Sequence, residues 1–281
     1  MKLNHTLLQA APAAAWAELH AAACAPYRRS SRWAWHWARG KLALDPVFRS
    51  MLDRGDLPAR ARVLDIGCGQ GLVASLLQAC AGLQHEGHWP AAWPVQASAL
   101  AYTGIELMPK DVARAEQALG GLALAPRFIS TDMRSAAFPA CDLVVILDVL
   151  HYVGHADQEA VLRRVRDALA TSQGRPGRLL LRVGDAASTR GFAFSQWVDR
   201  VVTVARGHRV PPVFSRTLAQ WTQLLQGLGF SVRAVPQSQG TPFANVLLVA
   251  DLLVADLLVA DLRVADLRVA DLQAGTESDA R

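Results

Sequence analysis

A glycine-rich turn follows a short apolar run between Val63 and Gly71, where the sequence is VLDIGCGQG. Because glycine has no Cβ, the backbone at Gly67 and Gly69 could lie directly against a bound ligand. A helix beginning after the turn would also offer free N–H groups at its first residues. A dinucleotide site would read GxGxxG, but here the third glycine comes one residue early and Leu72 stands in its place. The pattern therefore predicts a site for a nucleoside or amino-acid ligand rather than for NAD or FAD.

Two more apolar runs end in side chains that could hold such a ligand. Glu106 follows Ala101–Ile105, and a carboxylate at the end of a strand can accept hydrogen bonds from the vicinal hydroxyls of a ribose. Asp132 and Met133 follow Pro126–Ile129. A carboxylate accepts from an exocyclic amino group and a thioether suits an aromatic face, although an aspartate here is also a common turn former.

A third group of polar side chains follows the apolar run Leu143–Leu147, namely Asp148, His151 and Tyr152. This run is continuously apolar, which is typical of a strand buried on both faces. Histidine has an ordinary pKa near neutrality, so His151 is a candidate general base. The alternative is that His151 is a structural hydrogen-bonding residue.

Strand-like and helix-like segments alternate through most of the chain. The expected strands are Arg62–Ile66, Ala101–Ile105, Pro126–Ile129, Leu143–Leu147, Arg178–Val183, Phe230–Val235 and Ala244–Val249. The helices expected between them are Leu72–Cys80, Asp111–Leu119, Asp157–Ala170 and Thr217–Leu228. This alternation predicts a parallel sheet with helical crossovers, whose strand ends would gather the polar residues at one edge.

Residues 12 to 55 are expected to be helical. The predicted helices are Ala13–Cys24, Ser31–Lys41 and Asp45–Leu52, with Asp45 as an N-cap and Pro46 as the first helical residue. The proline-containing segment Gly82–Ser98 is expected to be a loop.

Four segments resemble, in their order along the chain, the motifs of class I S-adenosylmethionine-dependent methyltransferases. They are the DIGCGQG turn, the acidic strand end at Glu106, the stretch at Asp132 and the segment LDVLHYV. The resemblance implies an α/β fold: a Rossmann-like, seven-stranded, mostly parallel sheet with an N-terminal helical cap. It implies S-adenosyl-L-methionine as cofactor, with Glu106 on the ribose, Asp132 on the adenine amino group and Met133 against the ring. The residues expected to bind the cofactor are Asp65, Gly67, Cys68, Gly69, Glu106, Leu107, Asp132, Met133 and Asp148. His151 and Asp148 are the expected catalytic residues, Asp148 orienting either cofactor or acceptor.

A narrower resemblance covers residues ~13 to 250 and includes the segment from Pro26 to Leu42. This part of the chain is similar to methyltransferases encoded in bacterial aryl-polyene and related type II polyketide clusters. This resemblance implies a small-molecule or acyl-carrier-bound aromatic acceptor and a contact with an acyl carrier protein. The N-terminal helices and Arg190–Ser215 are rich in aromatic residues and arginine, and they are expected to select the acceptor. The alternative is that these residues only pack a cap onto the sheet.

Composition narrows the possible partners. The chain has 281 residues, a hydrophobic fraction of 52%, a net charge of +5 and a pI of about 9.4. Almost all of the positive charge is arginine, with lysine only at Lys2, Lys41 and Lys110, which we attribute to compositional bias rather than to nucleic-acid binding. No run approaches the ~18 apolar residues of a membrane span, and the four cysteines have no metal-ligand spacing. We therefore expect a cytoplasmic protein with reduced cysteines and without a metal, a membrane or a nucleic-acid partner.

Three parts are expected along the chain: a helical cap at residues 1–55, the methyltransferase domain at 56–250 and a repeat tail at 251–281. The tail repeats ADLLV, ADLLV, ADLRV, ADLRV, ADLQA from Ala250 onward. This resembles pentapeptide-repeat β-helices, but too few repeats are present to stack into a core. We interpret the tail as a tandem duplication of the last strand's end, locally helical and without function.

Two other functions remain open from the sequence. The basic pI allows methylation of RNA or protein, although no Asn/Asp-Pro-Pro-Tyr/Phe motif follows the fourth strand and no basic track with interleaved aromatics is present. The chain could also be a non-catalytic partner protein with a methyltransferase fold, although its motifs are intact.

Overall fold

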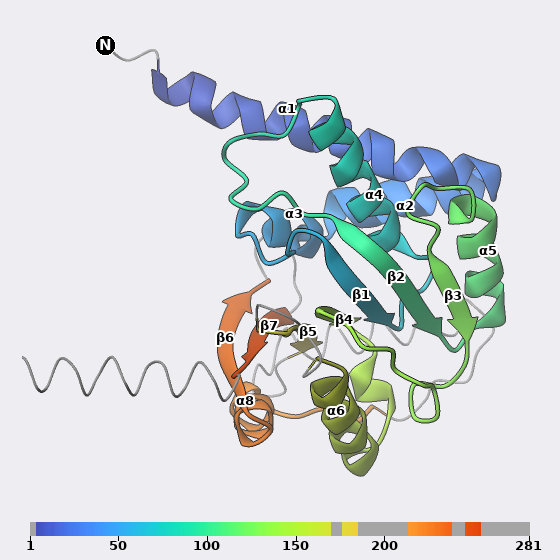
Figure 1. Cartoon of the computed structure of the whole chain (residues 1–281), viewed down its shortest axis with the longest axis vertical. Helices are drawn as coiled ribbons and strands as arrows, with labels where there is room; N and C mark the ends of the chain where they lie inside the picture. The colour runs from blue at the N-terminus through green and yellow to red at the C-terminus, as the bar shows by residue number, and fades with distance from the viewer. Residues whose placement is uncertain (1–3, 170–175, 185–212, 238–244, 254–281) are drawn as a thin grey trace, which may run out of the picture.

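The centre of the molecule is a seven-stranded sheet with the strand order β3-β2-β1-β4-β5-β7-β6 (Figure 1). A computed structural model describes residues 4–169, 176–184, 213–237 and 245–253, with side chains from residue 13 onward. The strands are β1 (Ala61–Ile66), β2 (Ala99–Glu106), β3 (Arg127–Ser130), β4 (Leu143–Leu147), β5 (Arg178–Gly184), β6 (Phe230–Pro236) and β7 (Asn245–Leu252). Strands β1 to β5 run parallel, whereas β7 runs antiparallel to both β5 and β6. The predicted α/β fold with a mostly parallel, seven-stranded sheet is confirmed.

All of the predicted strands form, and the bounds of β4 are those expected. Strand β7 extends to Leu252, three residues beyond the predicted end at Val249. The extension follows the alternation of the strand: Leu248, Ala250 and Leu252 all face the same half of the core. The first residues of the repeat thus continue the strand, and the remainder of the predicted tail lies outside the described residues.

Helices cover both faces of the sheet (Figure 1). On one face lie α1 (Asn4–Cys24), the 3₁₀ helix η1 (Ala25–Arg29), α2 (Arg32–Leu44), α3 (Pro46–Asp53), α4 (Leu72–His85) and α5 (Pro109–Leu119). On the other lie α6 (His155–Leu169) and α8 (Leu218–Gly227). Residues of α1 to α3 and η1 share one hydrophobic core with α4, α5 and the sheet, so the N-terminal helices form a layer over this face.

The largest differences between the predicted and the observed helix boundaries lie in α1 and α4. Helix α1 begins at Asn4 rather than at Ala13 and continues through Pro12; the leucine, glutamine and alanine residues just before this proline are good helix formers. Helix α4 continues to His85, so the prediction of a loop from Gly82 was wrong for its first turn. Leu83 is buried there, which favours one more helical turn against the core.

The predicted start of α3 is confirmed in detail. The Asp45 carboxylate accepts a hydrogen bond from the backbone N–H of Val47 (3.2 Å), and Pro46 is the first helical residue. Asp45 also ends α2, where its own N–H donates to the Lys41 carbonyl (3.0 Å). This one aspartate therefore forms the junction of two cap helices. Among the described residues, no helix combines the length and the apolar character that crossing a membrane requires.

Candidate active site

The carboxyl ends of the parallel strands gather the predicted residues at one edge of the sheet. Strand β1 leads into the glycine turn, β2 ends at Glu106, and β4 leads to Asp148. The order in which strands are added to the sheet reverses between β1 and β4: β2 and β3 lie on one side of this pair, and β5 lies on the other. Open α/β sheets bind ligands at such a switch point.

The glycine turn is shaped by three residues in left-handed backbone conformations: φ is 74° at Gly67, 54° at Gly69 and 75° at Gly71. A Cβ at Gly67 would lie 2.5 Å from both methyl groups of Val149, and one at Gly71 would lie 2.7 Å from the Phe128 ring. At Gly67 the missing side chain thus makes room for Val149, whereas the sequence analysis had assigned that room to a ligand. A Cβ at Gly69 would meet nothing within 4 Å. Gly69 is therefore the glycine of this turn that faces open space.

Glu106 lies directly beside this open space and holds the turn in place. Its Oε2 accepts from the backbone N–H of Gly69 (2.9 Å), and its Oε1 accepts from that of Met108 (2.9 Å). The side chain is half-buried, and each carboxylate oxygen keeps acceptor capacity beyond these bonds. Leu107, the next residue, is largely exposed. The carboxylate thus stands at the turn with acceptors for a further ligand.

Asp132 and Met133 follow β3, both half-buried. The Asp132 carboxylate is held by the Arg134 guanidinium, whose Nε donates to Oδ1 (3.1 Å) and whose Nη2 donates to Oδ2 (2.7 Å). These hydrogen bonds lower the pKa of Asp132, with burial opposing them. For Asp132 to accept from an adenine amino group, Arg134 must share or release this carboxylate. No sequence motif had indicated a role for Arg134.

Asp65 and Cys68 lie beneath the turn, inside the protein. The Tyr102 hydroxyl donates to the Asp65 carboxylate (2.5 Å), and both side chains are buried. Burial raises the pKa of Asp65 to about 7, the Tyr102 hydrogen bond lowers it and the Glu106 charge raises it further. Burial also raises the pKa of the Cys68 thiol well above its ordinary value. In this geometry both residues support the turn from within, and direct contact with a cofactor stays a prediction for them.

Asp148 and His151 lie where β4 ends. Asp148 has a left-handed backbone with φ of 60°, and its carboxylate forms an ion pair with Arg182 of β5. His151 belongs to the 3₁₀ helix η2 (Leu150–Tyr152), and its ring lies 4.2 Å from that of Tyr152 between centroids. Its carbonyl accepts from the N–H of Phe214 (2.8 Å), which joins η2 to the segment before α8. The structure thus places both candidate catalytic residues at the predicted edge of the sheet.

The N-terminal cap reaches the glycine turn through Tyr27, a contact that the sequence did not reveal. The Tyr27 hydroxyl donates to the carbonyl of Gln70 (2.9 Å), and the side chain is fully buried against Trp37. The Gln70 side chain donates in turn to Asp111 of α5 (3.3 Å). Tyr27 lies in the N-terminal segment expected to select the acceptor, and its side chain packs the cap onto the turn.

Replacing Tyr27 by phenylalanine is expected to lower the free energy of unfolding by about 1–3 kcal/mol, because the buried Gln70 carbonyl loses its donor while the ring packing stays. Urea unfolding of the wild type and Tyr27→Phe measures this difference. Equal stability of the two proteins would contradict a structural link between Tyr27 and the turn.

Gly69→Ala is expected to keep the fold at a cost of roughly 1–2 kcal/mol, because alanine is strained in a left-handed backbone. It is expected to bind a ligand of the turn at least about tenfold more weakly, because the new Cβ would occupy the open space. Gly87→Ala is a matched control: Gly87 also has a left-handed backbone (φ 76°) with nothing near its Cβ position, but lies after α4. Calorimetric titration with S-adenosylmethionine and a thermal melt of both variants make the comparison. Equal affinities would show that no ligand lies over Gly69.

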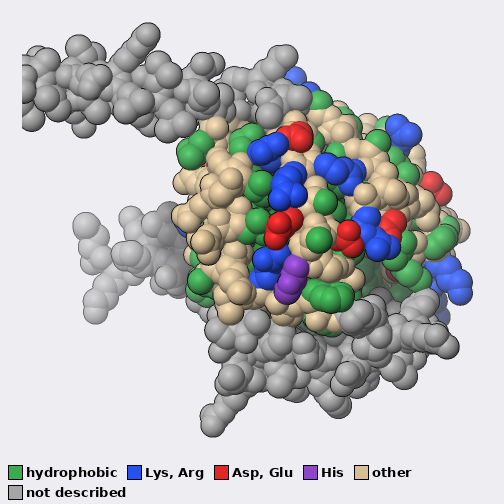
Figure 2. All heavy atoms as spheres, turned by 90° about the horizontal axis from the view of Figure 1, so that it is seen from below, with side chains coloured by type: hydrophobic (Ala, Val, Ile, Leu, Met, Phe, Trp, Pro, Cys, Tyr) green, Lys and Arg blue, Asp and Glu red, His purple; other side chains and the backbone are tan. Residues whose placement is uncertain are grey.

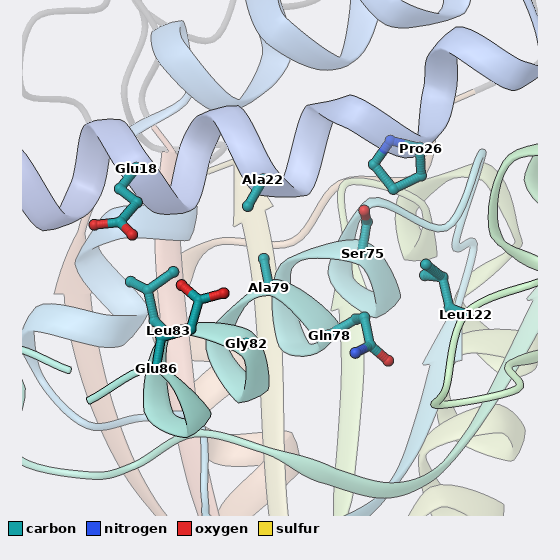
Figure 3. Close-up of a pocket in the computed structure, with 10 residues that line it drawn as sticks. All are labelled: Glu18, Ala22, Pro26, Ser75, Gln78, Ala79, Gly82, Leu83, Glu86 and Leu122. Carbon is teal, nitrogen blue, oxygen red and sulfur yellow. The ribbon is translucent and has the colours of Figure 1, made fainter. Parts of the chain in front are cut away.

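A groove elsewhere on the molecule lies between α1 and α4 (Figure 3). It is lined mostly by small and apolar side chains such as Ala22, Ala79 and Leu83. Ser75, at its wall, already donates to the Ala23 carbonyl (2.6 Å). None of the predicted site residues lines this groove, so it belongs to the seam between cap and domain.

The sheet, its switch point and the glycine turn define an α/β domain of the class that binds ligands at the carboxyl ends of its strands. The chain belongs to the methyltransferase domain family, which it matches over residues 34–235. No curated protein sequence gives a significant match.

Solved structures with a similar fold include methyltransferases and a biosynthetic protein. The magnesium protoporphyrin IX methyltransferase of Synechocystis, solved with bound SAH, has 20% identity and a TM-score of 0.50, over 75% of this chain and 82% of that one. The pyocyanin biosynthetic protein PhzM has 18% identity and a TM-score of 0.53, over 78% of this chain and 58% of its own. The N,N-8-amino-8-demethyl-D-riboflavin dimethyltransferase of Streptomyces davawensis has 22% identity and a TM-score of 0.50, over 79% and 58%. These likenesses establish the shared fold.

Proposed function

We propose that the chain transfers a methyl group from S-adenosyl-L-methionine to a small or carrier-bound aromatic acceptor, at a phenolic oxygen or an activated ring carbon. The observation that carries this proposal is the position of Glu106, whose carboxylate adjoins the one glycine of the turn that faces open space. A carboxylate there can accept from both hydroxyls of a ribose.

The residues present fit this cofactor at four of the nine predicted positions. Gly69 leaves room beside the backbone, and Glu106 supplies acceptors for the ribose. Met133, half-buried after β3, suits one face of an adenine ring. Asp132 fits if Arg134 shares the carboxylate, since two oxygens offer more acceptor sites than the guanidinium uses.

The bound cofactor supplies a sulfonium-activated methyl group, so the protein needs no strong catalyst of its own. The chain's residues hold the acceptor in line with that methyl group and exclude water. His151 accepts the proton of a phenolic hydroxyl at a ring nitrogen, which raises the nucleophilicity of the oxygen. Asp148, beside it at the end of β4, orients the reactants. These roles agree with the location of both residues at the strand ends.

The acceptor class rests on the narrower resemblance and on the cap. An aryl-polyene head group, a hydroxyphenyl unit on an acyl carrier protein, is the specific acceptor that we propose. Pyocyanin biosynthesis and riboflavin-derivative dimethylation, named for two neighbours, are consistent with aromatic chemistry on this fold. Most of the segment Arg190–Ser215, predicted to help select the acceptor, lies outside the described residues.

We also propose the division into a cap at 1–55, a methyltransferase domain at 56–250 and a tail at 251–281, and a cytoplasmic location. The cysteines fit such a location, since Cys24, Cys68, Cys80 and Cys141 are all free and buried. Residues of the proposed cap share a core with those of the domain, so the cap would be an integral layer.

A small acceptor is favoured over nucleic acid by the surface around α6 and α8 (Figure 2). Arginines there alternate with carboxylates and pair with them, as Arg163 and Arg216 do with Glu159, and Arg166 with Asp167. In the described part of this face, the arginines are thus largely neutralised and form no uninterrupted basic track.

The proposal is tested in two steps. Calorimetric titration of the purified protein with S-adenosylmethionine, and separately with NADH, is expected to give binding of the first alone. Transfer of a labelled methyl group is then measured to hydroxyphenyl acids, free and attached to an acyl carrier protein, with a short RNA as the competing acceptor. A folded protein that binds no S-adenosylmethionine would contradict the function and favour a non-catalytic partner protein.

A further inference from the structure

Arg182 places a buried charge in strand β5, at a position where a sheet covered on both faces normally has an apolar side chain. It is 3% exposed and lies in register with Leu147 of β4 on one side and Leu247 of β7 on the other. Two residues earlier in the same strand, Leu180 points into the core beneath the cap. By this alternation Arg182 also faces the cap.

The Arg182 guanidinium binds two carboxylates from opposite parts of the molecule. Its Nε donates to Asp148 Oδ1 (2.8 Å), and its Nη2 donates to Asp148 Oδ2. Its Nη1 and Nη2 also donate to the two oxygens of Asp45 (2.5 and 2.8 Å). The guanidinium therefore joins the junction of α2 and α3 to the residue that follows β4.

Charge in this cluster is nearly balanced. Lys41 adds a second cation at 2.7 Å from Asp45, on the exposed side. Burial alone would raise the pKa of Asp45, but the hydrogen bonds and charge of Arg182 outweigh it and lower the pKa well below its usual range. Asp45 is thus an anion held in the interior by Arg182.

Stability is a weak reason for such an arrangement. The free energy needed to remove charged groups from water offsets much of their electrostatic attraction in the interior. Replacing a whole buried ion cluster by apolar residues therefore often leaves the stability of a protein unchanged or raises it. The geometry at Asp148 suggests a different role. This residue has a left-handed backbone, which is uncommon for residues other than glycine, although aspartate adopts it more readily than most. Its side chain remains 37% exposed at the edge where the reaction is proposed.

We infer that Arg182 is a positioning residue for methyl transfer: it fixes Asp148 at the site and makes that position depend on the docking of the cap at Asp45. This inference rests on the proposed function. Binding of the cofactor against a fixed Asp148 would then also stabilise α2 and α3, because the three side chains act as one unit.

Asp45→Asn and Arg182→Lys test the inference from its two ends. Asparagine still caps α3 but loses the charge that Arg182 binds, and a lysine ammonium cannot form both forked pairs. Lys41→Gln is the matched control, because it removes the other cation of Asp45 and leaves the bridge through Arg182 intact. Each protein is titrated with S-adenosylhomocysteine, and amide hydrogen exchange in α2 and α3 is followed with and without this ligand.

Slower exchange in α2 and α3 on ligand binding is expected for the wild type and Lys41→Gln. Loss of this protection and about tenfold weaker binding are expected for Asp45→Asn and Arg182→Lys. Wild-type affinity and protection in both variants would overturn the inference, as would variants too unstable to fold, since the cluster would then serve stability alone. A wild type that binds the ligand without protecting the cap would overturn it too. A wild type that does not bind the ligand would instead contradict the proposed function, and the inference with it.

Discussion

Glu106→Ala is expected to bind S-adenosylmethionine at least about a hundredfold more weakly than the wild type, because hydrogen bonds to a charged acceptor contribute roughly 1.5–3 kcal/mol each. Two such bonds, one to each ribose hydroxyl, would be lost together. The carboxylate also holds the N–H groups of Gly69 and Met108, so the turn would lose its internal support as well. Calorimetric titration measures the affinity directly.

Two comparisons separate these effects. Glu116→Ala removes an exposed glutamate of α5 and controls for the change in net charge. Glu106→Gln keeps the size of the side chain but can accept at only one oxygen, so its affinity should fall between those of wild type and alanine variant. A thermal melt of each variant reports whether the turn has loosened the fold. Near-wild-type affinity of a well-folded Glu106→Ala protein would show that the ribose does not lie at this carboxylate.

The sequence predicted the sheet well because the fold depends on patterns that are local in the chain. Leu143–Leu147 is continuously apolar, and the structure buries it between β1 and β5 as that pattern requires. The glycine turn and the carboxylate at Glu106 are also local features, since each lies directly after its strand. A parallel sheet then brings them to the same edge without further information from the chain.

Contacts between distant segments could not be predicted in this way. Arg182 lies in the run LLLRV, where alternation indicates a buried strand but not the carboxylates that an arginine would bind. Its partner Asp45 is 137 residues away and was predicted only as a helix cap. Tyr27 and Gln70, 43 residues apart, form a bond of the same kind. Such pairs arise when layers pack on each other, and a single sequence contains no signal for them.

A second group of differences concerns why a residue type is present at a position, rather than where the residue lies in the structure. Gly67 was predicted as a point of close approach for a ligand, but the missing Cβ makes room for Val149. Asp65 was predicted at the cofactor; its carboxylate accepts from Tyr102 in the interior, and its contact with a cofactor stays a prediction. In both cases the motif marks the turn, and side-chain packing gives its residues a structural role that the motif alone did not indicate.

Asp65 should make the stability of the protein fall as the pH rises. Burial raises the pKa of its carboxyl to about 7 in the folded protein, against about 3.9 for an unfolded chain. Between these values the folded state holds a proton that the unfolded state has released. The stabilising contribution is therefore complete below pH ~4 and is lost as the pH rises through about 7.

The free energy of unfolding measured in urea at pH 5 and pH 8 gives the size of this effect. From pH 5 to pH 8 the wild type is expected to lose roughly 3 kcal/mol more than Asp65→Asn, since asparagine has no proton to release. Taking the difference between the two proteins removes the contribution of groups that titrate in both. Parallel pH profiles would mean that the Asp65 carboxyl is ionised throughout this range.

Tyr102→Phe provides the matched test, because the Tyr102 hydroxyl donates to Asp65 and so favours the ionised carboxylate. Without this donor the pKa of Asp65 should rise further, and the loss of stability should move to higher pH. A shift in the opposite direction would mean that the hydroxyl accepts the carboxyl proton instead of donating its own.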